Sequence, residues 1–179
     1  MMYDLPTTVD VAGIPREIRS DYRAILDICR ALNDPELSNE EKAFVCLGIF
    51  YVDDIEPTNE ALTECFRFIG GGKLDTDNKK GPKLMDWEQD FQFIVAPVNR
   101  VIGQEIRALP YLHWWTFLSA YYEIGECTFS QIVRIRDQKA RGKALDQYDQ
   151  KWYREHRDLV DIKTKYTEAE NKLLKQWGV

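Results

Sequence analysis

The sequence contains few residues that support metal or redox chemistry. Its two histidines, His113 and His156, form neither an HxxxH nor an HExxH spacing, so we predict no metal site. The four cysteines are far apart and include no CxxC pair; they are Cys29, Cys46, Cys65 and Cys127. Each of them lies in an otherwise apolar helical pattern. We therefore expect reduced thiols in the protein core and an intracellular setting.

The sequence also lacks a long apolar segment. No window approaches the roughly 20 apolar residues that a helix needs to cross a bilayer. The N-terminus, MMYDLPTTVD, carries an acid and no apolar run, so it does not have the pattern of a secretory signal. We expect a soluble protein that is not exported, with one domain of 179 residues and 44% apolar composition and an appended element.

Two ligand-binding motifs are incomplete. A phosphate-binding loop needs a glycine five residues before its Gly-Lys pair and a Ser or Thr after it, and Gly72-Lys73 has neither. Asp75 and Asp77 begin like a calcium loop, but Lys79 stands where the third oxygen ligand belongs. The sequence therefore predicts no cofactor.

Negative charge exceeds positive charge, but the excess is uneven. The chain has a formal net charge of −6, while residues 134–176 carry 12 Lys/Arg against 8 Asp/Glu, which leaves 12 against 22 for the rest. A basic run opens this second part, with Arg134, Arg136, Lys139, Arg141 and Lys143. In an acidic chain we interpret the run as a solvated connector or a contact for an acidic partner, and we predict no nucleic-acid binding.

The remaining pattern predicts a mainly α protein with a compact helical bundle. Residues 8–11 and 14–18 flank Ala12-Gly13 and favour a short β-ribbon, with Pro15 at an edge. Ser20 or Asp21 can cap the first helix, and the sequence SNEE at 38–41 forms a capping box for the second. We assign residues 1–143 to this body of five or six helices.

A further helix should begin after Asp86, with Gln89 completing a capping box. Pro97 lies within its apolar pattern and removes a backbone donor, so we expect a kink or a break there. We expect the next helix to begin at Pro110.

The segment YLHWWTF at 111–117 has apolar side chains around most of a helix, which is typical of a central packing helix. His113 has no Ser, Cys or Asp at helical spacing, so we interpret it as a packed histidine rather than a catalytic base. We expect its ring nitrogens to find a backbone or a carboxylate partner, with Asp86, Glu88 and Asp90 as the candidate carboxylates. We predict that Trp115 is buried and that Trp114, on a different face, is the better contact residue.

Residues 144–179 carry apolar side chains in a heptad pattern and predict one long C-terminal helix. Two interpretations of its apolar stripe remain open. The helix can fold back onto the body as ordinary core, or it can mediate self-association or client binding.

The order of several motifs resembles that of a known protein family. The motifs are the ribbon, SDYR at 20–23, DWEQD at 86–90, LHWWTF at 112–117 and RIR at 134–136. Together they resemble the tail assembly chaperones of tailed phages and prophages of Gram-positive bacteria, which are encoded just before the tape measure protein. The resemblance covers roughly residues 5 to 151. Its most specific residues, and the candidate partner contacts, are Asp86, Trp87, Asp90, His113, Trp114, Trp115 and Phe117.

The resemblance implies a non-catalytic role in the cytoplasm of the bacterial host. Such chaperones coat the long helical tape measure protein until tail tube subunits displace them, and they are absent from the finished virion. Amphipathic helices that cover another helix meet this need, and self-association would add avidity. The alternative is a structural adaptor of the head-tail or tail-tip region, and a weaker alternative is a phage hydrolase, which lacks a nucleophile or metal constellation here.

Overall fold

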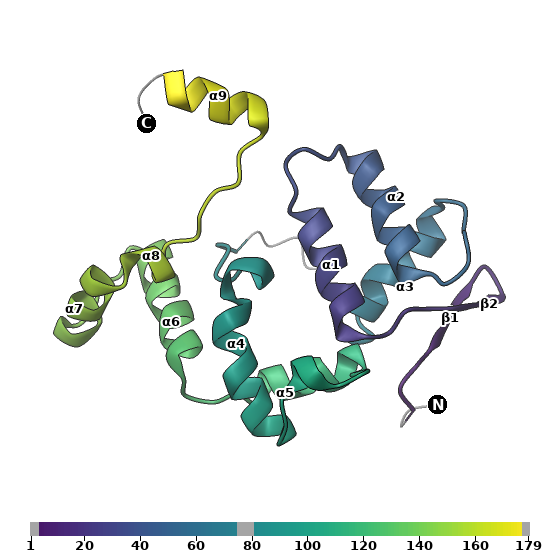
Figure 1. Cartoon of the computed structure of the whole chain (residues 1–179), viewed down its shortest axis with the longest axis horizontal. Coiled ribbons are helices and arrows are strands. Elements are labelled where there is room, and N and C mark those ends of the chain that lie inside the picture. Colours follow the sequence, from purple (N-terminus) through teal and green to yellow (C-terminus); the bar gives the residue numbers. More distant parts are fainter. Residues whose placement is uncertain (1–3, 75–80, 177–179) are drawn as a thin grey trace. The chain divides into compact units, whose positions relative to one another are not determined.

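Helices dominate the computed structural model, which describes residues 4–74 and 81–176. The predicted mainly α fold with an N-terminal β-ribbon is confirmed (Figure 1). The chain divides into two units. Unit 1 comprises the described residues of Met1–Thr76, His113–Trp115 and Thr164–Val179, and unit 2 those of Asp77–Leu112 and Thr116–Lys163. The predicted domain boundary after residue 143 stays a prediction, and the calcium-loop comparison at 75–79 lies outside the described residues.

Unit 1 begins with a β-hairpin. Strands β1 (Thr8–Val11) and β2 (Ile14–Glu17) pair antiparallel, with Val11 opposite Ile14. Ala12 and Gly13 connect them with φ angles of 53° and 82°, which is the left-handed backbone that a tight hairpin turn requires. The predicted ribbon and the position of Pro15 within it are confirmed.

Three helices follow in unit 1: α1 (Tyr22–Leu32), α2 (Asn39–Phe50) and α3 (Asn59–Ile69). Asp21 caps α1, and the predicted capping box at the start of α2 is present: Ser38 Oγ accepts from the Glu41 amide, and the Glu41 carboxylate accepts from the Ser38 amide. α1 packs on α2, and α2 packs on α3. Their buried apolar side chains include Tyr22, Ile25, Ile28, Cys46, Leu47, Phe50, Ala61, Cys65 and Phe68.

Unit 2 contains α4 (Trp87–Ile102), the 3-10 turn η1 (Ile106–Ala108), most of α5 (Trp114–Tyr122), α6 (Thr128–Ala140), α7 (Gln147–Glu155) and α8 (Arg157–Val160). α4 runs through Pro97 to a left-handed cap at Gly103, so the predicted break is wrong, and the alternative, a kink, stays a prediction. Proline costs α4 one backbone hydrogen bond, and the buried side chains of Ile94, Val95 and Val98 hold the helix around it.

Helix α5 begins at Trp114, and the predicted start at Pro110 is wrong. The residues before Trp114 are extended because they pair with another segment. His113 forms an antiparallel bridge with Asp21, and the Trp114 amide donates to the Ser20 carbonyl over 2.8 Å. This pairing lies far away in sequence and has no local signal.

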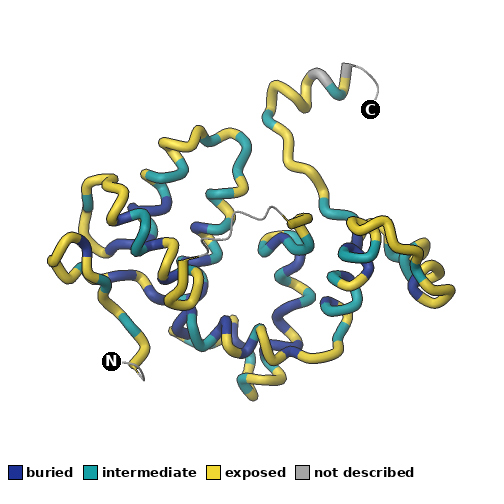
Figure 2. The backbone as a smooth tube through the Cα atoms, turned by 180° about the vertical axis from the view of Figure 1, so that it is seen from behind, coloured by how far each residue is buried: buried dark blue, intermediate teal, exposed yellow. Residues whose placement is uncertain are grey.

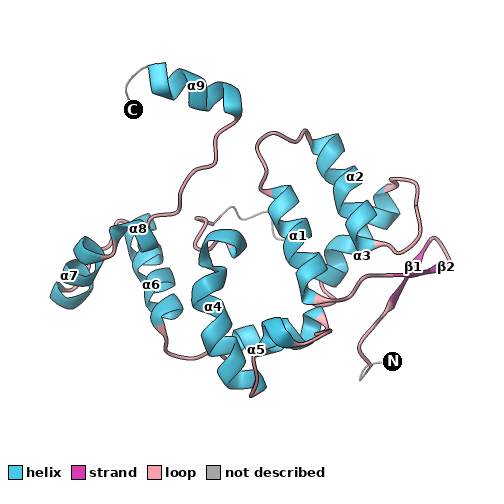
Figure 3. Ribbon diagram, viewed as in Figure 1, coloured by secondary structure: helices cyan, strands magenta, loops and turns pink. Residues whose placement is uncertain are grey.

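The single long C-terminal helix is also wrong. The segment forms α7, α8 and a separate α9 (Glu168–Gln176), with a loop between α8 and α9 (Figure 3). Thr167 and Glu170 form a capping arrangement that starts α9 anew, since the Thr167 amide donates to the Glu170 carboxylate and the Glu170 amide donates to Thr167 Oγ1. Residues 163–166 are exposed (Figure 2).

The first part of this segment folds back as core. Val160 is fully buried with Ile132 and Ile135 of α6, and this cluster is covered by Phe93, Leu145, Trp152, Tyr153 and Leu159. Of the two interpretations of the C-terminal apolar stripe, the structure supports intramolecular packing for residues 145–160.

Candidate functional site

The motif residues belong to two separate structural centres. Asp86, Trp87, Asp90 and Phe117 lie in unit 2, whereas His113, Trp114 and Trp115 lie in unit 1. Each centre is therefore described with its own neighbours.

The centre of unit 2 is a buried ion pair between α4 and α6. Arg136 donates through both terminal nitrogens to Asp90, at 2.6 Å to Oδ2 and 2.9 Å to Oδ1, and their side chains are 5% and 0% exposed. The same guanidinium donates to the carbonyls of Val160 (2.6 Å), Leu84 (3.0 Å) and Leu159 (3.2 Å). A buried charge needs such complete pairing, so this arginine ties three chain segments together.

Asp86 and Asp90 act together at the start of α4. Asp86 Oδ1 accepts from the amides of Glu88 and Gln89, both at 3.1 Å, and Asp90 Oδ2 accepts from the Asp86 amide at 2.9 Å. The predicted cap is confirmed, but Gln89 does not complete the box. Its side chain donates to the Asp161 carbonyl and accepts from the Lys163 amide instead.

The charge state of Asp86 follows from these contacts. Burial alone raises the pKa of this carboxyl group. Hydrogen bonds from the Lys83 ammonium, at 2.7 Å, and from the amides of Gln89 and Glu88 outweigh burial, so the pKa of Asp86 lies below its usual value. The group is a helix cap held in its charged form.

Trp87 and Phe117 belong to an aromatic cluster in unit 2. The Trp87 ring lies 6.0 Å from Phe117 and 5.0 Å from Tyr121, and Tyr121 lies 6.0 Å from Phe129. Burial raises the pKa of Tyr121 to about 12, and its hydroxyl donates to the sulfur of Met85 over 3.3 Å. These contacts are packing contacts between α4, α5 and α6.

In unit 1, His113 is the residue that starts α5. Its Nδ1 accepts from the Trp115 amide at 3.0 Å, and its Nε2 lies 3.0 Å from the Pro6 carbonyl, to which it donates. These contacts fit the tautomer that carries its proton on Nε2. The packed histidine is confirmed, and of its two predicted kinds of partner the structure shows the backbone, because both ring nitrogens of His113 bond to backbone groups. The candidate carboxylate of Asp90 is engaged by Arg136.

The two tryptophans bind the end of α3. Trp114 Nε1 donates to the Ile69 carbonyl and Trp115 Nε1 to the Phe68 carbonyl, each at 2.9 Å. Both carbonyls belong to the last turn of α3, and that of Phe68 also accepts from the Gly71 amide at 3.0 Å. The double tryptophan is thus a C-terminal cap supplied from a distant segment.

The predicted order of burial for these indoles is wrong. Trp114 is 1% exposed, whereas Trp115 is half-buried and stacks on Phe68 with ring centroids 5.5 Å apart. Helical spacing places the two rings on different faces but does not tell which face points inward. The contact with Ile69, which decides it, comes from a remote segment.

Four cations of the basic run pair with carboxylates within unit 2, and of these the side chains of Arg134 and Arg141 are 51% and 60% exposed while Arg136 is buried. Arg134 pairs with Asp149 at 2.8 Å, and Asp149 is 1% exposed. The other pairs are Arg136 with Asp90, Lys139 with Asp161 and Arg141 with Asp137. We did not predict that Arg136 is a buried, structural residue. Its spacing from Ile132 and Ile135 places it on the apolar face of α6, and this signal was present in the sequence.

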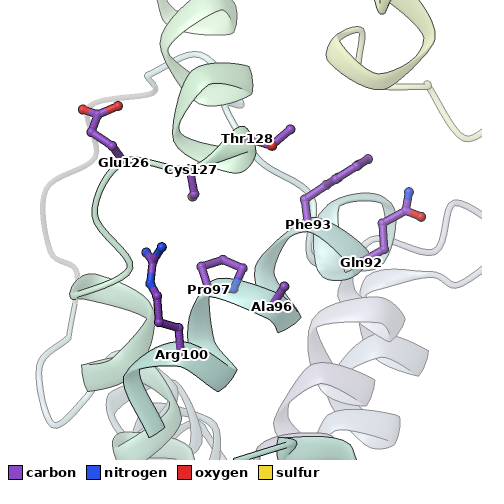
Figure 4. Close-up of a pocket in the computed structure, with 8 residues that line it drawn as sticks. All are labelled: Gln92, Phe93, Ala96, Pro97, Arg100, Glu126, Cys127 and Thr128. Carbon is purple, nitrogen blue, oxygen red and sulfur yellow. The ribbon is translucent and has the colours of Figure 1, made fainter. Parts of the chain in front are cut away.

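A pocket of about 380 Å³ lies in unit 2 (Figure 4). It is lined by Gln92, Phe93, Ala96, Pro97, Arg100, Glu126, Cys127 and Thr128. Arg100 and Glu126 supply opposite charges, so the pocket favours neither an anion nor a cation. The Arg100 guanidinium already donates to the Ile124 carbonyl.

Metal and thiol chemistry have little geometric support. Among residues 4–74 and 81–176, no three His, Cys, Asp or Glu side chains are grouped to hold a metal ion. The four cysteines are free thiols; Cys46 and Cys65 lie in the core as predicted, whereas Cys29 and Cys127 are partly buried. Burial raises the pKa of Cys29 to about 12 and of Cys46 to about 11, which suppresses the reactive thiolate.

In the described part of the chain, no helix has the length and apolarity to cross a membrane.

Comparison with known proteins gives one family. The family model described as Bacteriophage Gp15 protein matches residues 1–162. This range contains all of the motif residues and ends just beyond α8. Neither the curated proteins nor the solved structures contain a match.

Proposed function

We propose that this chain, which belongs to the bacteriophage Gp15 protein family, is a non-catalytic tail assembly chaperone that binds and solubilises the tape measure protein. Membership makes it a phage protein. The proposal adds that the client is the tape measure protein, that the chain acts during tail assembly, and that it acts in the cytoplasm of the bacterial host. Tail tube protein would then displace the chaperone as the tube forms around the tape measure protein.

One observation carries the proposal: both units expose large apolar side chains. The set comprises Leu5, Ile14, Phe44, Val52, Phe66, Leu74, Val101, Tyr111, Tyr122, Tyr148 and Tyr166. Single exposed apolar residues are normal on a protein surface, but several on helices provide material for covering an apolar helix of a client. Many copies along one client would build up avidity from weak individual contacts.

The motif residues support the proposal indirectly. Asp90, His113 and Trp114 are buried, and their polar atoms are engaged in holding helices together. Their role in the fold explains the motif without a reaction. The binding surface must then be sought among exposed residues rather than in the motif.

Co-expression tests the chaperone directly. The chain is produced together with the tape measure protein of the same phage, and the soluble fraction of the tape measure protein is measured with and without it. We expect the client to be soluble only in its presence and to co-purify with it. An insoluble client in both cultures would refute the chaperone function.

Mass spectrometry of purified virions separates the chaperone from a structural adaptor. A chaperone is absent from finished particles, whereas an adaptor is present in a fixed copy number. Detection of this chain at a constant ratio to the major capsid protein would assign it to the particle instead.

A further inference from the structure

Helix α2 carries one large exposed aromatic side chain beside its buried apolar face. Cys46, Leu47 and Phe50 are buried in unit 1, whereas Phe44, in the middle of the helix, is 70% exposed. In unit 1, α1 and α3 contact α2, and the Phe44 side chain stays exposed beside these contacts.

Gly48 lies one turn after Phe44 on the same face. It is exposed, and a Cβ atom built on it would meet nothing within 4 Å. Packing inside unit 1 therefore does not require glycine, although glycine lowers the stability of a helix interior relative to alanine. The missing side chain does allow the backbone of another helix to approach closely beside the Phe44 ring.

Carboxylates border this apolar strip. At 100° per residue, Glu40, Glu41, Phe44 and Gly48 fall within an arc of about 100°. Asp53, Asp54 and Glu56 are exposed just after α2. Residues 4–74 carry 14 Asp/Glu against 7 Lys/Arg in all. A partner helix with basic flanks complements this charge.

We propose that the α2 face, defined by Glu40, Glu41, Phe44 and Gly48, docks an amphipathic helix whose apolar stripe is flanked by lysine or arginine. The inference rests on the proposed function, because it identifies the client segment as such a helix of the tape measure protein. Phe44 packs into the apolar stripe, the client backbone crosses at Gly48, and Glu40 pairs with the basic flank, while Glu41, whose carboxylate accepts from the Ser38 amide, adds its negative charge.

Two labelled model peptides test the charge and the apolar contact. Both are amphipathic helices with the same leucine stripe, one flanked by lysines and the other by glutamates, and fluorescence anisotropy measures their binding to the full chain. We expect the lysine-flanked peptide to bind and the glutamate-flanked peptide to bind at least tenfold more weakly. The difference should shrink at high salt. Equal binding of both peptides would overturn the charge argument.

Substitutions on the α2 face test its location. Phe44→Ala should weaken binding of the lysine-flanked peptide roughly 30-fold, as loss of a central aromatic contact does. Gly48→Gln should weaken binding roughly tenfold or more while the melting temperature holds or rises, because glutamine favours the helix but blocks close approach. A merely structural role of Gly48 cannot produce that combination. Unchanged affinity in both variants would place the binding site elsewhere.

Tyr148→Ala is the matched comparison, because Tyr148 is 69% exposed on α7, comparable with Phe44. It should lower peptide affinity much less than Phe44→Ala does, and an equal loss would mean that exposed apolar side chains bind without preference for the α2 face. Sedimentation of the full chain tests whether a second copy of this chain, rather than a client helix, binds the α2 face. A dimer that Phe44→Ala dissociates without changing peptide affinity would overturn the proposal.

Co-expression of the tape measure protein with Phe44→Ala and with Gly48→Gln separates the two proposals. If the client is soluble with both variants, the α2 face is refuted as the binding site, whereas the chaperone function is not.

Discussion

At the scale of single residues, the ion pair between Asp90 and Arg136 dominates the energetics of unit 2. Asp90→Asn leaves the guanidinium buried without its counter-charge, so we expect the free energy of unfolding to fall by about 3–5 kcal/mol. Chemical denaturation measures this loss. Arg141→Gln, which removes an exposed pair with Asp137, should cost only about 0.3–0.5 kcal/mol. Equal costs for the two variants would contradict a buried ion pair.

The two tryptophans differ in burial, and their substitutions should differ in cost. Trp114→Ala removes a fully buried indole and should lower stability by about 3–5 kcal/mol. Trp115→Ala removes a half-buried ring that stacks on Phe68, and we expect about 1–3 kcal/mol from the lost stacking and hydrogen bond. Thermal melts of both variants provide the measurement. A larger loss for Trp115→Ala would restore the order of burial predicted from the sequence.

At the scale of elements, the start of α4 should depend on pH through Asp86. Its pKa is lower in the folded protein than the value of about 3.9 in an unfolded chain, so its contribution is present above pH 4 and is lost as pH falls through the folded pKa. Asp86→Asn keeps a capping side chain but cannot titrate. We therefore expect wild type to be more stable than this variant at pH 6, with the difference shrinking below pH 4. A difference that is independent of pH would exclude Asp86 as the titrating group.

The sequence was informative about elements wherever the deciding interaction is local. The capping box at Ser38 and the hairpin turn at Ala12-Gly13 involve neighbours in sequence, and both were predicted correctly. The start of α5 was not, because Ser20 and Asp21 pair with the segment before Trp114 from about 90 residues away. Within the candidate site, the backbone contact of His113 with the Trp115 amide is local, whereas Pro6 and Arg136, the other partners of His113 and Asp90, lie in distant segments that sequence spacing does not reveal.

At the scale of the whole molecule, the chain uses its motif to build two units rather than one site. Arg136 gathers Leu84, Asp90 and Val160 in unit 2, while Trp114 and Trp115 close α3 in unit 1. The most specific sequence pattern therefore encodes packing. Under the proposed function, recognition of a client depends on exposed residues such as Phe44, which no motif marked.

Stepwise truncation tests how far unit 2 extends along the chain. A chain that ends at Lys163 keeps Val160 in the core with Ile132 and Ile135, and it keeps the carbonyl that receives Arg136 Nε. We expect it to melt close to the full chain. A chain that ends at Lys143 exposes both isoleucines and leaves the buried guanidinium without two of its carbonyl partners, so unit 2 should lose its cooperative unfolding and its amide protection in α6. Hydrogen exchange of α6 in the two truncated chains makes the comparison. Equal protection in both would instead support an independent body that ends at residue 143, with α7 and α8 as an appended element.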